Sequence, residues 1–195
     1  MIALTESQVV GLWKYMTKKY GTVVVSKARA DEMQAAAAAL ALMGIMDAKT
    51  FLSEYTTTIG KRIYVPFEVG NASDCSLYSQ VQICVHEHVH VRQFKDDKAL
   101  FFLQYCLDSS KRASFECEAY VASMEMIFQI TDVCPSPAKT ASLLKAYGCN
   151  KSDVNVAAVY LKAASSVIKK GGVITPESKI ALSWLHKNVL KTRSR

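Results

Sequence analysis

Apolar residues recur at intervals of three and four along most of the chain, and this spacing predicts a largely helical protein. The first helix opens at a capping box, Thr5–Gln8, and ends at Gly21. Ser26 is expected to cap an Ala-rich helix that runs to Met43 and closes at Gly44. A short helix opens at Asp47, and the same spacing predicts further helices over residues 76–95, from 97 to a break at 108–111, and over 112–130, 137–147, 152–170 and 176–190.

Three short segments are richer in β-branched residues and predict strands. Thr22–Val25 is one, and residues 55–59 and 62–67 flank Gly60-Lys61 as a β-hairpin would. Pro66 has no N–H to donate, so the second hairpin strand is confined to an edge or an end of its sheet. The fold class is therefore α+β and predominantly α.

The clearest boundary in the chain is Val-Cys-Pro-Ser-Pro at residues 133–137. A chain of 195 residues suits one domain with a small appendage. We therefore expect a core over 1–132 and a helical subdomain over 133–195 that packs on it.

Residues 86–90 read His-Glu-His-Val-His and contain the pattern His-Glu-x-x-His. On a helix, His86 and His90 lie one above the other on one face and can both bind one ion. Glu87 sits about 100° round the helix from His86, within reach of a water bound to that ion. Two neutral imidazoles suit zinc, and the carboxylate can then act as general base. His88 points away from this face, and we expect it at the surface or behind the ligands.

The helical interpretation of this segment decides whether the site can exist. Residues 76–95 contain neither Gly nor Pro, and Asp74 or Ser76 can cap the start. The β-branched residues in it would also suit a strand. A strand would direct His86, Glu87 and His90 to alternating faces, and the site would fail.

A catalytic zinc site needs a third protein ligand and an open position. Glu116 and Glu118 are both available in a following helical segment. They lie about 200° apart on a helix, so both cannot face one metal ion.

Residues 77–125 resemble the gluzincin superfamily of zinc metallopeptidases, in which a Glu on a following helix completes the site. Several branches carry Glu-x-x-Ala-Asp there, and the run from Glu116 to Tyr120 matches with Glu116 as ligand. Tyr120 stands where the family has the Asp that supports a ligand histidine. Gln93 extends the pattern to His-Glu-x-x-His-x-x-Gln, which relatives also show. The resemblance implies a zincin-like core with one Zn²⁺ per chain.

The resemblance also implies further roles. Gluzincins often stabilise the oxyanion with a downstream His or a Tyr, for which His186, Tyr120 and Tyr105 are candidates here. An edge strand before the metal helix binds extended substrate in the family, and the hairpin is in the right place for it. The segment from Thr56 to Glu68 is similar to uncharacterised peptidase domains of phages and bacteria.

Charge, hydropathy and cysteine spacing limit the partners and the cellular location that we expect for the protein. The net charge is +7 and is concentrated from Lys162 onward, without aromatic interleaving, so nucleic acid is not favoured as a partner. No apolar run is long enough to span a membrane, and Met1–Gln8 does not resemble a signal peptide. We expect a cytoplasmic protein, with virion association as an alternative. No metal-ligand spacing links the cysteines, which we expect to be free thiols: Cys75, Cys84, Cys106, Cys117, Cys134 and Cys149. A disulfide between Cys134 and Cys149, which both lie near expected loops, is the alternative.

The leading hypothesis is a zinc metalloendopeptidase acting on proteins or peptides, with Glu87 as general base. The alternative is an inactive metal-binding protein, structural or virion-associated, that keeps the peptidase fold and binds an assembly partner. Tyr120 in place of the family's Asp favours the alternative, and the intact Glu87 favours catalysis.

Overall fold

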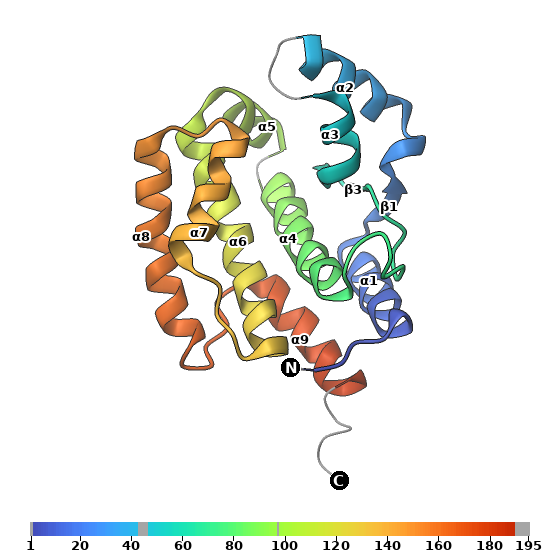
Figure 1. Cartoon of the computed structure of the whole chain (residues 1–195), viewed down its shortest axis with the longest axis vertical. Coiled ribbons are helices and arrows are strands. Elements are labelled where there is room, and N and C mark those ends of the chain that lie inside the picture. Colours follow the sequence, from blue (N-terminus) through green and yellow to red (C-terminus); the bar gives the residue numbers. More distant parts are fainter. Residues whose placement is uncertain (1, 43–46, 97, 190–195) are drawn as a thin grey trace.

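The computed structural model describes residues 2–42, 47–96 and 98–189, and it is predominantly helical with a small three-stranded sheet (Figure 1). The α-helices are α1 (Glu6–Tyr20), α2 (Asp31–Leu42), α3 (Ala48–Glu54), α4 (Leu77–Asp96), α5 (Lys98–Leu107), α6 (Ser109–Thr131), α7 (Pro137–Ser142), α8 (Lys151–Ile168) and α9 (Pro176–Asn188). The strands are β1 (Val23–Ser26), β2 (Thr57–Ile59) and β3 (Arg62–Val65), and two 3₁₀ segments are η1 (Lys27–Arg29) and η2 (Leu143–Tyr147). The predicted mostly helical α+β class is confirmed.

Local capping chemistry sets most helix ends where the residue pattern predicts them. Thr5 and Gln8 form the expected capping box at α1, and Gly21 ends that helix with a left-handed backbone, φ 64°. Ser76 accepts the backbone N–H of Ser79 at the start of α4. Asp108 caps α6 at the predicted break. Each of these capping interactions joins residues within about one helical turn of each other.

The expected cap at Ser26 is wrong. Ser26 pairs with Val65 as the last residue of β1, and its side chain makes no capping hydrogen bond. The chain then turns through η1, and the helical hydrogen bonds of α2 start from the carbonyl of Ala30, which is itself extended. Strand pairing keeps Ser26 extended and outside the helix. The predicted end of this helix at Met43 and Gly44 lies outside the described residues.

The sheet has the order β1-β3-β2. β3 runs parallel to β1 and antiparallel to β2, with Ile63 opposite both Val24 and Thr58. The predicted hairpin is thus confirmed, and Pro66 directly follows the end of β3, where no ladder bond is lost. β3 is the central strand, so the edge strand of the hairpin is β2, which packs along α4.

Helix α4 lies at the centre of the molecule and packs against α1, α5, α6 and α9 (Figure 1). The side of α4 that faces α1 and β3 is apolar, and the resulting cluster includes Leu12, Trp13, Ile63, Val85 and Val89. The indole N–H of Trp13 donates to the carbonyl of Gln80, 3.1 Å away, so this buried polar group is satisfied.

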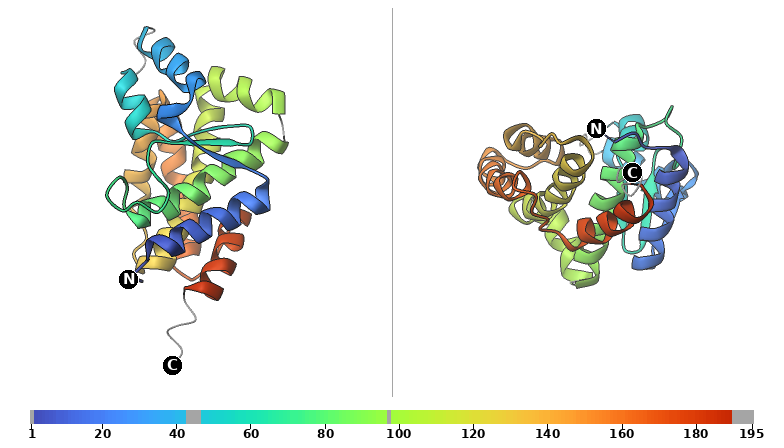
Figure 2. Two further views of the ribbon diagram at one scale, coloured as in Figure 1. Left: turned by 90° about the vertical axis from the view of Figure 1, so that its right-hand side faces the viewer. Right: turned by 90° about the horizontal axis from the view of Figure 1, so that it is seen from below.

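A second apolar cluster lies between α6, α7, η2 and α8, and α6 contributes to both clusters. Ala119 and Met126 face the first cluster, while Val121 and Met124 face the second. After α8 the chain returns to the first cluster through α9, which crosses between α6 and α1 (Figure 2, right). The predicted division at residue 132 is not tested by this packing and stays a prediction.

Among the described helices, none is both long enough and apolar enough to span a bilayer. The six cysteines are all free thiols.

Because α6 is shared, we predict that damage in the second cluster destabilises the whole protein. Leu161 on α8 is fully buried in that cluster, and Leu161→Ala should lower the free energy of unfolding by about 2–5 kcal/mol. Val159 on the same helix is 71% exposed, so Val159→Ala is the matched control and should change little. Urea unfolding followed by circular dichroism and by tryptophan fluorescence should give one coincident transition; two separate transitions would contradict the coupling.

Candidate metal centre

Three side chains from two packed helices converge on one point. His86 and His90 lie one turn apart on α4, and Glu116 faces them from α6. The two Nε2 atoms are 3.2 Å apart, and each lies 3.4 Å from a different carboxylate oxygen of Glu116. These residues form a group that could hold a metal ion.

The spacing of these atoms fits a tetrahedral metal site. Two ligand atoms about 2.0–2.1 Å from an ion lie roughly 3.3 Å apart at a tetrahedral angle. Glu116 is 1% exposed, and its Oε2 accepts no hydrogen bond from any described residue. A buried carboxylate oxygen without a donor is costly, and a bound cation would remove that cost.

Both histidines are oriented with Nε2 toward this point. The Oγ of Ser123 lies 3.3 Å from Nδ1 of His86 and donates its own proton to the carbonyl of Ala119, so it can accept from the ring. Nδ1 of His90 lies 2.9 Å from Oε1 of Gln93. We therefore place a proton on Nδ1 of each ring, so that Nε2 is the atom of each ring that can bind an ion.

Glu116 is held from a third helix. Tyr105 on α5 donates its hydroxyl to Oε1 of Glu116 at 2.6 Å, and this bond and burial raise the pKa of Tyr105 well above its usual value. Burial alone would lower the pKa of His90 and raise that of Glu116. The attraction between them outweighs burial in both, so the pKa of His90 is raised to about 9 and that of Glu116 is lowered. The hydroxyl of Tyr105 is thus engaged with Glu116.

A cleft of about 290 Å³ opens beside His86 and Glu87. Glu87 is only 6% exposed, and one of its oxygens accepts the hydroxyl of Thr58 on β2 at 2.7 Å. The hydrogen bond holds the carboxylate in place next to the first ligand. The rest of the cleft is lined by Glu54, Tyr55, Thr56, Gln82, Ile83, Tyr120, Ser123, Leu143, Ala146 and Tyr147.

Lys27 anchors the wall of this cleft, and no pattern in the sequence singled it out. Its side chain is fully buried, which is rare for lysine. The ammonium donates to the carbonyls of Phe51 and Tyr55 at 2.8 and 2.7 Å and to the hydroxyl of Thr57 at 2.9 Å. Burial lowers the pKa of Lys27 to about 8, against the attraction of the nearby Glu87. These bonds fix the segment that leads from α3 into β2.

Two tyrosines face the cleft from the opposite side. The ring of Tyr120 meets the ring of His86 edge-on, with centroids 5.4 Å apart, and makes no described hydrogen bond to a ligand. Support of His86 through Nδ1 comes instead from Ser123, one turn further along α6. Tyr147 of η2 lines the same wall and was missed by sequence reasoning, because nothing near it in the chain marks it. Burial, and then the charge of Glu116, raises the pKa of both tyrosines.

Two residues considered from the sequence lie away from the cleft. His186 is exposed on α9 and is not among the residues that line it. Glu118, the alternative third ligand, instead binds Arg92 at 2.5 Å and Gln93 at 2.8 Å. The geometry therefore selects Glu116 over Glu118.

The expectation that His88 lies at the surface or behind the ligands is wrong. It is fully buried on the opposite face of α4, where its ring packs against Tyr20. Nδ1 donates to the carbonyl of Cys84 at 2.6 Å, and Nε2 accepts the hydroxyl of Thr22 at 3.1 Å. Burial lowers the pKa of His88 to about 4, so the ring is neutral at physiological pH. The face of α4 that carries His88 is covered by α1 and β1, which helical periodicity alone does not predict.

Because Glu116 raises the pKa of His90 to about 9, a metal ion must displace a proton from His90 at lower pH. We predict that metal affinity rises about tenfold per pH unit between pH 6 and pH 8, since one proton leaves His90 per ion bound. Titration calorimetry in buffers of different ionisation enthalpy measures both the affinity and the protons released. An affinity independent of pH over this range would contradict the site.

Comparisons with protein-family models, with curated proteins and with solved structures found no match to this chain. Its function is therefore inferred from the geometry of the site itself.

Proposed function

We propose that the protein is a zinc-dependent peptidase of gluzincin type, with a zincin-like core built on α4 and α6. Zn²⁺ would be held by His86, His90 and Glu116. The observation that carries the proposal is the convergence of these three ligands beside a cleft that also holds Glu87. Two imidazoles and one carboxylate suit zinc, but also iron. The resemblance of residues 77–125 to zinc peptidases is what favours zinc over iron in this proposal.

In this mechanism zinc supplies Lewis acidity and a bound water of lowered pKa when it occupies the site. Glu87 would take a proton from the attacking water and pass it to the leaving amine. Thr58 holds the carboxylate of Glu87 through one oxygen, which leaves the other oxygen for the proton transfer. Tyr120 and Tyr147 line the cleft, and their hydroxyls would be the donors available to stabilise the developing oxyanion.

The substrate in this proposal is an extended protein or peptide segment. β2 is an edge strand beside α4, and Tyr55 and Thr56, which lead into it, line the cleft. An edge strand offers unpaired backbone groups to an extended chain. Of the earlier oxyanion candidates, Tyr105 donates its hydroxyl to Glu116 and His186 lies away from the cleft, so neither is kept in that role.

The competing proposal is a metal-binding protein of structural or virion-associated role without peptidase activity. It shares the metal site, and it differs only in whether Glu87 acts on a substrate. The intact Glu87, held beside His86 by the Thr58 hydroxyl, favours catalysis.

We predict that Glu87→Gln keeps bound zinc and lowers hydrolysis of casein or a fluorogenic peptide library by at least about 10²-fold, because an amide cannot take the proton. Glu54 is another carboxylate that lines the cleft, but it is exposed and not beside a ligand. Glu54→Gln is therefore the matched control and should keep most of the activity.

Retained hydrolysis in Glu87→Gln would overturn the mechanism. Zinc binding without hydrolysis of any library peptide by the wild type would favour the structural role instead.

A further inference from the structure

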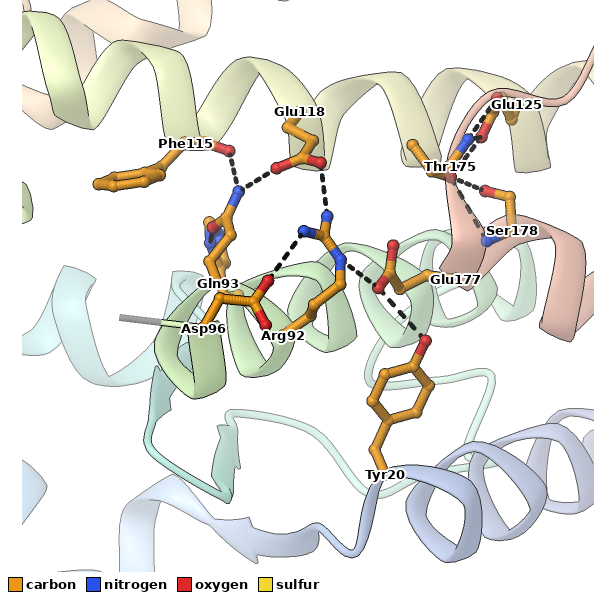
Figure 3. A network of polar contacts seen from close by, with 11 residues as sticks. Tyr20, Arg92, Gln93, Asp96, Phe115, Glu118, Glu125, Thr175, Glu177 and Ser178 are labelled. Atoms are coloured by element: carbon orange, nitrogen blue, oxygen red, sulfur yellow. Dashed lines mark hydrogen bonds and ion pairs between the residues drawn. The ribbon is translucent and has the colours of Figure 1, made fainter. Parts of the chain in front are cut away.

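A chain of hydrogen bonds runs from His90 through Gln93 into the helix interface. Figure 3 shows the part of it that joins Gln93, Glu118 and Arg92. Oε1 of Gln93 faces Nδ1 of His90 at 2.9 Å. The amide Nε2 of Gln93 donates to Oε2 of Glu118 at 2.8 Å and to the carbonyl of Phe115 at 3.1 Å. Gln93 is 6% exposed, so these partners account for its amide.

The partners of Gln93 decide which way round its amide lies. A carboxylate and a carbonyl can only accept, so the NH₂ of Gln93 must face Glu118 and Phe115. Its oxygen is then left to face His90, and it can only accept as well. Nδ1 of His90 must therefore carry a proton, which leaves Nε2 as the atom that can bind a metal ion.

Glu118 is itself held as a hydrogen-bond acceptor by Arg92. The guanidinium donates to Oε1 of Glu118 at 2.5 Å and to Glu177 at 2.8 Å, and it pairs with Asp96 at 3.6 Å. Glu177 is fully buried at the start of α9 and also accepts the hydroxyl of Tyr20 (Figure 3). Because an arginine never accepts, Glu118 must present an acceptor to Arg92 and to Gln93 alike.

We propose that Glu118 is a positioning residue of the metal centre, which acts through Gln93 to hold His90 with Nδ1 protonated and Nε2 directed at the ion. The inference rests on the metal-binding part of the proposed function and not on peptidase activity. It gives Glu118 a task in the site without making it a ligand.

The test replaces the acceptor-only group by an amide of the same shape. In Glu118→Gln, Arg92 still binds the new amide oxygen, so the new NH₂ faces the NH₂ of Gln93. Either two donors then oppose each other or Gln93 turns over and presents NH₂ to His90. We expect zinc affinity, measured by competition with a chromophoric chelator, to fall about 10–100-fold.

Asp96→Asn is the matched control, because it also removes a carboxylate that pairs with Arg92. Asp96 is exposed and touches neither Gln93 nor a ligand in the described contacts. Its zinc affinity should stay within about twofold of the wild type, since exposed ion pairs contribute little.

A double-mutant cycle separates action through Gln93 from simple attraction between Glu118 and the ion. Gln93→Met removes the link between Glu118 and His90. If Glu118 acts through Gln93, adding Glu118→Gln to Gln93→Met costs no further affinity. If the two losses multiply, Glu118 acts on its own and the proposal is overturned.

The Nδ1 proton of His90 can be observed directly by NMR, and a purely structural role of Glu118 would leave its signal unchanged. In protein labelled with ¹⁵N-histidine, the wild type should show a slowly exchanging Nδ1–H signal from His90, whether the ring is neutral or charged. That signal should be lost or broadened in Glu118→Gln. A wild-type protein that does not bind zinc would contradict the proposed function itself. Wild-type zinc affinity together with an intact Nδ1–H signal in Glu118→Gln would contradict only this inference.

Discussion

The packing of α6 along α4 is the constraint on which the site depends. It buries the carboxylate of Glu116 opposite the imidazoles of His86 and His90, where no described hydrogen bond satisfies one of its oxygens. A buried charge of this kind is tolerated only with compensation, which here comes from the imidazoles, from the Tyr105 hydroxyl and, in our account, from a bound ion. The same contact also joins the two apolar clusters, so the site lies where the fold is most constrained.

Two groups of hydrogen bonds hold the side chains of the site in place, one beside the cleft and one away from it. On the cleft side, Lys27 ties down the segment before β2, and Thr58 on that strand holds Glu87. On the far side, Gln93 and Glu118 orient His90. A rigid surround of this kind is what a catalytic carboxylate and its metal ligands require, because small displacements of either cost much of the rate.

The features predictable from the sequence are those that depend on neighbours within one or two helical turns. The capping box at Thr5 and the helix through His86 and His90 belong to this class. Glu116 was expected as the third member of the group from the resemblance to a family motif, and the structure places it opposite both histidines. The prediction that Ser26 caps a helix was wrong because Ser26 pairs with Val65, which is distant in the chain, and this strand pairing outweighs the preference of serine for a helix cap. The predicted location of His88 was wrong for a different reason. Helical periodicity shows that His88 points away from His86 and His90, but it does not show that α1 covers the opposite face of the helix.

Lys27, Thr58 and Tyr147 could not have been found from local pattern at all. Thr58 lies on β2, while Lys27 and Tyr147 lie on the short 3₁₀ segments η1 and η2, and the position of each of these elements depends on tertiary packing. The role of Glu118 was open for a related reason. Helix geometry excludes it as a ligand together with Glu116, but only the positions of Arg92 and Gln93 show what it binds instead.

The most direct test of the account is the zinc content per chain, measured by elemental analysis after dialysis against dilute zinc and then against zinc-free buffer. We predict one zinc ion per wild-type chain, an equal content in Asp96→Asn and almost none in Glu116→Ala, with all three folded by circular dichroism. A folded wild-type chain that holds no zinc, or a Glu116→Ala variant that holds as much as the wild type, would contradict the account.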